Sequence, residues 1–336
     1  MTMPPVPDLQ YGSDLSGLIC AYRFAPDQPG VPIDGAQAVA WLSSAAADGS
    51  FVWLHFSLSN AASERWLRQH LQLPPTFYET LQDSSSTRVE ESDDHLLAVL
   101  NDVVYFAIDA SSASPVHACV GPQAFVTARV TALRSLDRLR ARVKAGRAFR
   151  SSCALLAHLL GDQADVLADI VRDATRQVDA IEDKLLGGQA ASSRAKLGAL
   201  RRVLVRLQRL LAPEPAALFR LLNRPPAWVS EDDAHDLRQA AEELSVAVTD
   251  SAALGERVRL IQEEIAALIT EQTSRTLFVL TIVTVLALPM TIIPGLFGMN
   301  VGGVPFRDSG SGFWLALLVA GVTAAAGWFL VRVIRR

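Results

Sequence analysis

The residues best suited to chemistry form a tripeptide, Gly298-Met299-Asn300, between two long apolar segments. Glycine lets two backbones approach closely, and the Asn300 side chain carries a neutral carbonyl oxygen that accepts hydrogen bonds. At a membrane surface such an oxygen can bind the water shell of a cation without stripping it. The alternative is a Gly-Asn turn that only connects two hydrophobic helices.

Polar side chains also recur on one face of the apolar segment that precedes the tripeptide. The members of this face follow each other at spacings of three and four: Thr281, Thr284, Leu288, Thr291 and Gly295. Hydroxyl groups in an apolar segment are best placed facing a bundle interior or water. We expect this face to line a pore, with Leu277 and Leu288 as apolar constrictions that gate by dewetting. An equally favoured alternative is that each threonine bonds back to its own helix.

A second pattern extends this face toward the N-terminus as charged residues seven positions apart. Its members are Asp236, Glu243, Asp250, Glu264 and Glu271, with Arg257 at the remaining step. In a supercoiled ring of helices, a seven-residue repeat stays on one side. If that side faces inward, the acids of several copies form a negative funnel that concentrates cations. The alternative is a solvated helix face with local partners, such as Glu271 and Arg275.

The acidic repeat begins inside a cluster that also contains His235. Imidazole and carboxylate together suit Zn²⁺, whereas Mg²⁺ prefers oxygen ligands and water. We therefore take His235 and the five acids of the repeat as candidate metal ligands. Acidic residues at a helix start are also explained by the helix dipole alone.

These side chains need a membrane around them, and two segments of the sequence can cross one. The 336-residue chain has no charged residue at 276–306 or at 309–331. About 20 apolar residues in a helix cross a bilayer core, so each segment can span once. Arg275 precedes the first span, and Arg332, Arg335 and Arg336 follow the second. The positive-inside bias therefore predicts that both termini are cytoplasmic.

Several function classes lack the signature that they require. No GxxxxGK[ST], HExxH or GxSxG string occurs, so neither ATP-driven transport nor the commoner hydrolase chemistries are indicated. We expect no enzyme and no catalytic cofactor. A formal net charge of -4 argues against nucleic acid as a partner. The first 24 residues lack a basic end followed by an apolar run, so we expect no secretory signal.

The order of the remaining elements predicts an α+β cytoplasmic domain, a long helical stalk and two C-terminal transmembrane helices. Extended runs rich in Val, Phe, Tyr and Trp, at 18–24, 51–58, 96–106 and 116–130, predict one α/β domain at 1–150. Helical periodicity then predicts a hairpin at 151–230 and a stalk helix at 231–300 that continues into the first span at about 276–297. We expect an external loop at 301–312, a second span at 313–334 and a cytoplasmic tail at 335–336.

The stalk helix has a clear start and a regular apolar seam. Ser230 can cap the helix with Asp233 closing the capping box, and no proline follows before Pro289. We expect one helix from about Glu231 to Phe297. Its seam recurs every 3.5 residues between Leu237 and Ile269, which predicts packing against other copies of the chain. The alternative is packing on the hairpin of the same chain.

The tripeptide and its surroundings resemble a known family. A Gly-Met-Asn sequence that closes the first of two C-terminal spans, after a very long helix, is similar to the signature of the CorA family of divalent-cation channels and transporters. The continuation Val301-Gly302-Gly303-Val304-Pro305 and the Gly312-Phe313-Trp314 start of the second span resemble the ZntB zinc-transporter branch of that family.

The resemblance implies a homopentamer in a bacterial-type inner membrane, with five Asn300 amides around a hydrated ion in a central pore. It further implies Zn²⁺ as the transported ion, coupled to protons, although the segments 276–306 and 309–331 contain no ionisable residue. One alternative is a CorA-like channel for Mg²⁺, Ni²⁺ or Co²⁺, and another is a membrane-anchored sensor or scaffold. The loop at 301–312 carries only Arg307 and Asp308 as charges, which argues against a simple magnesium channel.

Overall fold

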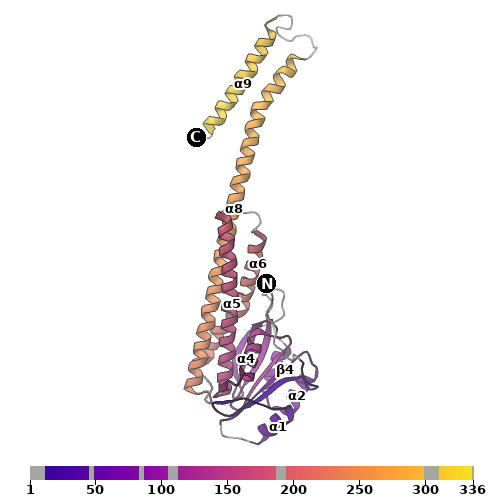
Figure 1. The fold of residues 1–336 in the computed structure, drawn as a ribbon, viewed down its shortest axis with the longest axis vertical. Coiled ribbons are helices and arrows are strands. Elements are labelled where there is room, and N and C mark those ends of the chain that lie inside the picture. Colours follow the sequence, from indigo (N-terminus) through magenta and orange to yellow (C-terminus); the bar gives the residue numbers. More distant parts are fainter. Residues whose placement is uncertain are drawn as a thin grey trace. The chain divides into compact units, whose positions relative to one another are not determined.

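The computed structural model describes residues 12–44, 49–82, 87–104, 113–186, 194–298 and 310–334. The chain forms two compact units, Met1–Ile261 and Gln262–Arg336. The first unit combines a β-sheet with helices, and the second contains only helical structure among its described residues (Figure 1).

A seven-stranded sheet with the order β3-β1-β4-β8-β7-β6-β5 forms the centre of the first unit. Its strands are β1 (Leu18–Phe24), β3 (Val31–Pro32), β4 (Phe51–Ser57), β5 (Arg88–Ser92), β6 (His95–Val103), β7 (Ala113–Val120) and β8 (Ala124–Arg129). Strands β4 and β8 pair in parallel, and the other neighbours are antiparallel. A small second sheet pairs β2 (Gln28–Pro29) with β9 (Ala148–Phe149).

The single extended run expected at 116–130 is wrong, because two strands occupy it. Strands β7 and β8 pair antiparallel, and the Gly121 N–H donates to the Ala124 carbonyl at 2.8 Å across the connection. Gly121-Pro122 therefore reverses the chain, as a glycine and proline pair commonly does. The hairpin of β5 and β6 was not expected as such. Its two-residue turn places Asp93 at φ 48° and Asp94 at φ 58°, the left-handed geometry that joins twisted strands tightly.

Helices cover both faces of the sheet, so the central strands are apolar on both sides. In β4, Trp53 packs into one core with α4 (Arg134–Lys144), α5 (Ser152–Leu186), α7 (Pro213–Leu222) and the start of α8 (Glu231–Phe297). Leu54, its neighbour in the strand, points into the opposite core with α1 (Gly35–Ser43), α2 (Ala62–His70) and α3 (Pro75–Gln82). This alternation follows from the two-residue period of a strand.

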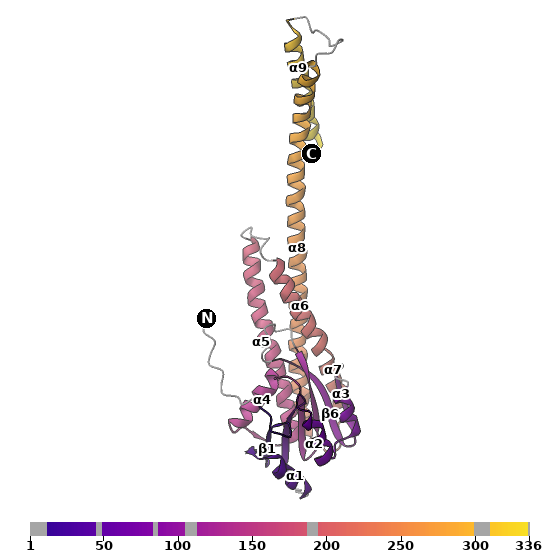
Figure 2. The ribbon, with the colours of Figure 1, turned by 90° about the vertical axis from the view of Figure 1, so that its right-hand side faces the viewer.

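Helices α5, α6 (Arg194–Leu211) and the first part of α8 lie side by side in the first unit (Figures 1 and 2). The expected unbroken helix from Glu231 to Phe297 is confirmed, and the Asp233 N–H donates to Ser230 Oγ at 3.1 Å at its start. The expectation that the seam packs against other copies is wrong for its first part. Leu237, Leu244 and Val258 are fully buried within the single chain.

In the second unit, the last part of α8 contacts α9 (Gly312–Ile334). A Cβ atom added at Gly327 of α9 would lie 3.1 Å from Val285 Cγ1, so the two helices approach closely because Gly327 has no side chain. Two helical segments, Glu231–Ile292 and Gly312–Phe329, are long and apolar enough to cross a membrane.

Candidate functional site

The polar face expected to line a pore is uncovered in the single chain. Leu277 is 58% exposed and Leu288 is 54% exposed, and the three threonines between Leu277 and Gly295 are exposed as well. At a constant turn of 3.6 residues, the face is centred roughly 80° around the helix from Val285. Helix α9 contacts Val285, so this contact leaves the polar face free for water or for another helix.

The threonine hydroxyls of this face also bond back to their own helix. Thr281 Oγ1 donates to the Leu277 carbonyl and Thr284 Oγ1 to the Leu280 carbonyl, each at 2.9 Å. Thr291 Oγ1 lies 3.0 Å from the Leu288 carbonyl. A hydroxyl that donates to its helix keeps lone pairs for a second partner. Back-bonding and exposure to a pore are therefore compatible.

The tripeptide begins where α8 ends. Gly298 follows the last helical residue, Phe297, and is exposed. Gly295 is also exposed, and a Cβ atom built there would meet no atom within 4 Å. Met299 and Asn300 lie outside the described residues.

The first positions of the acidic repeat lie on the side of α8 that faces α5. Asp236 accepts a hydrogen bond from Arg150 Nη2 at 2.8 Å, and Glu243 accepts one from Gln239 Nε2 at 3.0 Å. Arg257, which interrupts the repeat, pairs with Asp179 and Glu182 of α5. The structure thus gives these residues partners on their own chain, as expected for the alternative to a funnel.

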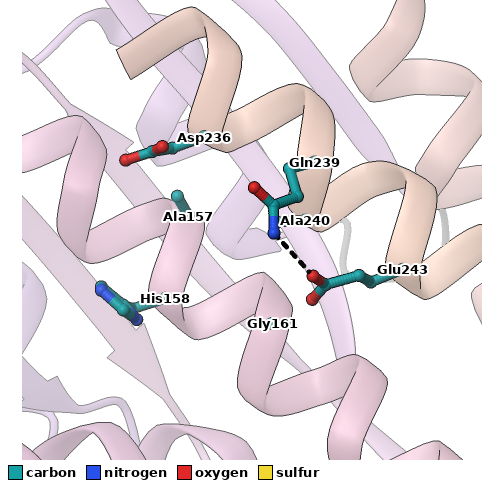
Figure 3. A pocket seen from close by; sticks show the side chains of 7 residues that line it. All are labelled: Ala157, His158, Gly161, Asp236, Gln239, Ala240 and Glu243. Carbon is teal, nitrogen blue, oxygen red and sulfur yellow. Dashed lines mark hydrogen bonds between the residues drawn. The ribbon is translucent and has the colours of Figure 1, made fainter. Parts of the chain in front are cut away.

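A cavity of about 250 Å³ between α5 and α8 contains part of this repeat, and Figure 3 shows the residues that line it. Asp236 and Glu243 line it from α8, and His158 and Gly161 line it from α5. Arg147 Nη2 lies 3.2 Å from His158 Nε2. Burial, followed by the charges of Arg147 and Arg142, lowers the pKa of His158, so the imidazole is neutral at pH 7.

The candidate metal ligands do not converge within one chain. His235 is exposed at the start of α8, and Glu264 and Glu271 are exposed in the second unit. In the described ranges, no three His, Cys, Asp or Glu side chains form a group that could hold a metal ion. A metal site built from these residues would need more than one copy of the chain.

A family model described as "CorA-like Mg2+ transporter protein" matches residues 48–335. The chain belongs to this CorA-like family. The divalent cation transporter CmaX of Pseudomonas aeruginosa is 30% identical over 291 residues, which cover 84% of this chain and 87% of that protein. The zinc transport protein ZntB of Pectobacterium carotovorum is 27% identical over 83% of this chain and 86% of its own length. A solved structure of full-length CmaX matches with a TM-score of 0.81 at 26% identity, over 96% of this chain and 99% of that one.

Two buried carboxylates of this CorA-family chain were not predicted from the sequence. Glu214, at the start of α7, is fully buried. Its Oε1 accepts the Asn101 backbone N–H at 2.6 Å, and its Oε2 accepts Gln163 Nε2 at 2.7 Å. Gln163 Nε2 also donates to the Asn101 carbonyl at 2.5 Å. Burial raises the pKa of Glu214 to about 8.

The second carboxylate, Asp102, caps a helix from within β6. It accepts hydrogen bonds from the Ser135 N–H at 2.9 Å, the Ser135 hydroxyl at 2.7 Å and the Leu136 N–H at 3.3 Å. Leu133, the capping residue of α4, has no side-chain acceptor of its own. Burial raises the pKa of Asp102 to about 6. The one signal in the sequence for either residue was an acidic residue with apolar neighbours along the chain.

Proposed function

We propose that this CorA-family chain transports divalent metal cations, with Zn²⁺ preferred, through the central pore of a homopentamer in the inner membrane. The observation that carries the proposal is the uncovered threonine face of the last part of α8, which leads directly to Gly298. A helix in lipid gains nothing from a row of hydroxyls, whereas a pore lined by them keeps water and ions solvated.

In this proposal the Asn300 amides of five copies form a ring that binds the hydrated ion. Leu277 and Leu288 of each copy form apolar constrictions between the threonines. Both termini are cytoplasmic, and the loop at 301–312 faces outward. A membrane potential of about 100 mV favours inward movement by roughly 2.3 kcal/mol per charge, or about 4.6 kcal/mol for a divalent ion, without ATP.

The last two acids of the repeat have a role in this proposal. Glu264 and Glu271 carry exposed carboxylates in the same unit as the threonine face. We propose that they attract cations, because charges of one sign around a narrow entrance raise the local concentration of the opposite sign. Asp236 and Glu243 have partners on their own chain and are not proposed as ligands of the transported ion.

A second candidate is Mg²⁺ transport, which the description of the matching family model favours. The relatives named CmaX and ZntB favour a broader divalent range or zinc. Proton coupling is part of the zinc proposal, and it would need an ionisable group outside both spans, because residues 276–306 and 309–331 contain none.

Purified full-length protein in liposomes tests the proposal. We expect Zn²⁺ entry, reported by a trapped zinc-sensitive dye, and faster entry when a pH gradient is imposed. Asn300→Ala should abolish flux at equal protein content. Flux of Mg²⁺ alone would support the second candidate, and absence of any flux would indicate a membrane-anchored sensor or scaffold.

A matched pair of threonine variants tests the assignment of the pore face. Thr284→Val removes a hydroxyl from the proposed face, and Thr323→Val removes a hydroxyl of α9 that is also exposed and also bonded back to its own helix. We expect Thr284→Val to lower Zn²⁺ flux several-fold and Thr323→Val to leave it unchanged. Equal effects of the two variants would contradict the assignment.

A further inference from the structure

Helix α6 presents a strongly basic face to solvent. Its 18 residues include no acidic residue and six basic ones: Arg194, Lys196, Arg201, Arg202, Arg206 and Arg209. Leu197, Leu204 and Leu207 are buried on the opposite side of the helix. In the described ranges, no ion pair within 4.0 Å joins any of these six side chains to a carboxylate. Within the described part of the chain these six side chains therefore form no ion pair, and the charge of Arg201 acts on Glu256 of α8.

An apolar side chain stands at the centre of this basic face. Val205 is 49% exposed. Arg201, Arg202 and Arg209 lie three or four residues away from it, which places them beside it on the helix surface. Arg206 follows it directly. An exposed apolar centre with a charged surround is the usual anatomy of a protein interface.

A groove between α5 and α8 also combines an exposed apolar centre with charged residues, but these residues are acidic. It has a volume of about 380 Å³, and Ala164, Ala168 and Ala247 give it an apolar lining. Val246 also lines it and is 61% exposed. The acids that line the groove are Asp165, Glu242, Glu243 and Asp250. Of these, Asp165 has a distant ion pair with Arg142 at 3.9 Å.

The two surfaces lie on different sides of the same group of helices. The buried leucines of α6 point toward the other helices, since Leu204 Cβ lies 4.0 Å from the position of a Cβ atom added at Gly255 of α8. Arg202, Arg206 and Arg209 therefore lie on the side of α6 that is turned away from α8 and from its groove with α5, whereas the charge of Arg201 acts on Glu256 of α8. A single chain cannot place its own basic face into its own groove.

We infer that the α5/α8 groove of one copy receives the basic face of α6 from a second copy. The inference rests on the self-assembly part of the proposed function and names the surfaces that carry it. Val205 and Val246 form the apolar centre of the contact, and the arginines of α6 pair with the groove acids around it. Complementary charge of this kind fixes the register and the choice of partner.

The position of the two surfaces also determines the symmetry of the assembly. A two-fold dimer joins one surface to an identical surface, whereas this contact joins two different surfaces. After a first contact, one copy keeps a free groove and the other keeps a free α6 face. Head-to-tail contacts of this type close into a ring when the rotation allows it, and a ring is the arrangement that a central pore requires.

Cysteine crosslinking of the full-length protein in detergent tests the contact directly. Val205→Cys and Val246→Cys introduce thiols at the two centres without removing a charge. Mild oxidation of the double variant should give a ladder of covalent oligomers that ends at the closed ring. Each single variant and the wild-type protein should give no ladder, because Cys119 and Cys153 are buried and Cys20 is partly buried.

The outcomes separate this inference from the proposed function. Dimers from a single variant would show a two-fold contact and overturn the head-to-tail arrangement. An oligomer by native mass that gives no ladder, yet still transports Zn²⁺, would overturn the contact and leave transport intact. A monomer without transport would overturn both.

Charge reversal supplies an independent test with a matched control. Arg202→Glu with Arg206→Glu, or Glu242→Arg with Glu243→Arg, should weaken self-association at least ten-fold, and the four changes combined should restore most of it. Arg172→Glu with Arg176→Glu reverses two arginines at the same spacing on an exposed face of α5, and should have no effect. Loss of binding to anionic lipid vesicles by the α6 reversal, with self-association unchanged, would identify a lipid surface instead and overturn the inference.

Discussion

Replacing Glu214 by Gln is expected to remove a large part of the fall in stability of the first unit between about pH 6 and pH 8. The carboxyl group is fully buried between β6, α5 and α7, where it accepts hydrogen bonds from Asn101 and Gln163. Burial disfavours its charged form, and the nearby carboxylate of Asp102 adds to this effect. The folded-state pKa is therefore raised, so the stabilising contribution of Glu214 is present at low pH and is lost as the pH rises toward 8.

The size of the effect follows from the raised pKa. The pKa moves from 4.5 to about 8. Between those values the folded state holds a proton that the unfolded state has released, so the free energy of unfolding falls on the order of 1 kcal/mol per pH unit. In a unit of this size, each kcal/mol shifts the midpoint of thermal unfolding by about 2–4 °C. We expect a fall on the order of 10 °C between pH 5 and pH 8.

Thermal unfolding of the full-length protein in detergent, followed by tryptophan fluorescence at several pH values, measures this effect. Glutamine has the shape of the protonated acid and cannot ionise, so Glu214→Gln should have a much flatter pH profile. Glu79→Gln, at an exposed position of α3, should retain the wild-type profile. Parallel profiles for wild type and Glu214→Gln would refute the reasoning, as would a wild-type midpoint that rises between pH 5 and pH 8.

Local signals in the sequence were sufficient to predict the long helix α8. The boundaries of α8 were predicted because a capping serine, an uninterrupted run without proline and a charge-free segment are each read from neighbouring residues. The strand at 18–24 was predicted for a similar reason. The split of 116–130 into β7 and β8 was missed because both strands are apolar and only Gly121-Pro122 marks the reversal.

Contacts between distant parts of the chain could not be predicted in the same way. Glu214 and Asn101 are 113 residues apart, and no pattern in either segment indicates the other. The apolar period of α8 identified the buried face correctly, but a period does not say whether the same chain or another copy covers it. The repeat of charges from Asp236 to Glu271 likewise did not show that Arg257 pairs with α5.

Two further substitutions test how the helices are held. Asp102→Ala should lower the free energy of unfolding by about 2 kcal/mol or more, because it removes the cap of α4 and leaves buried donors of Ser135 unpaired. Asp102→Asn keeps an acceptor, so it should lower the free energy of unfolding, measured in urea, by less. Gly327→Leu should destabilise the packing of α9 on α8 by roughly 1–3 kcal/mol. A Cβ atom at position 327 would already lie 3.1 Å from Val285 Cγ1, so the larger leucine side chain would clash with Val285. Gly321→Leu, where an added Cβ atom meets nothing within 4 Å, is the matched control, and the thermal midpoint in detergent is the measurement. Val285→Ala combined with Gly327→Leu should recover part of the lost thermal stability, since the smaller alanine returns space at the same contact. If thermal stability is not recovered, or if Gly321→Leu loses as much, close approach at Gly327 does not hold these helices together.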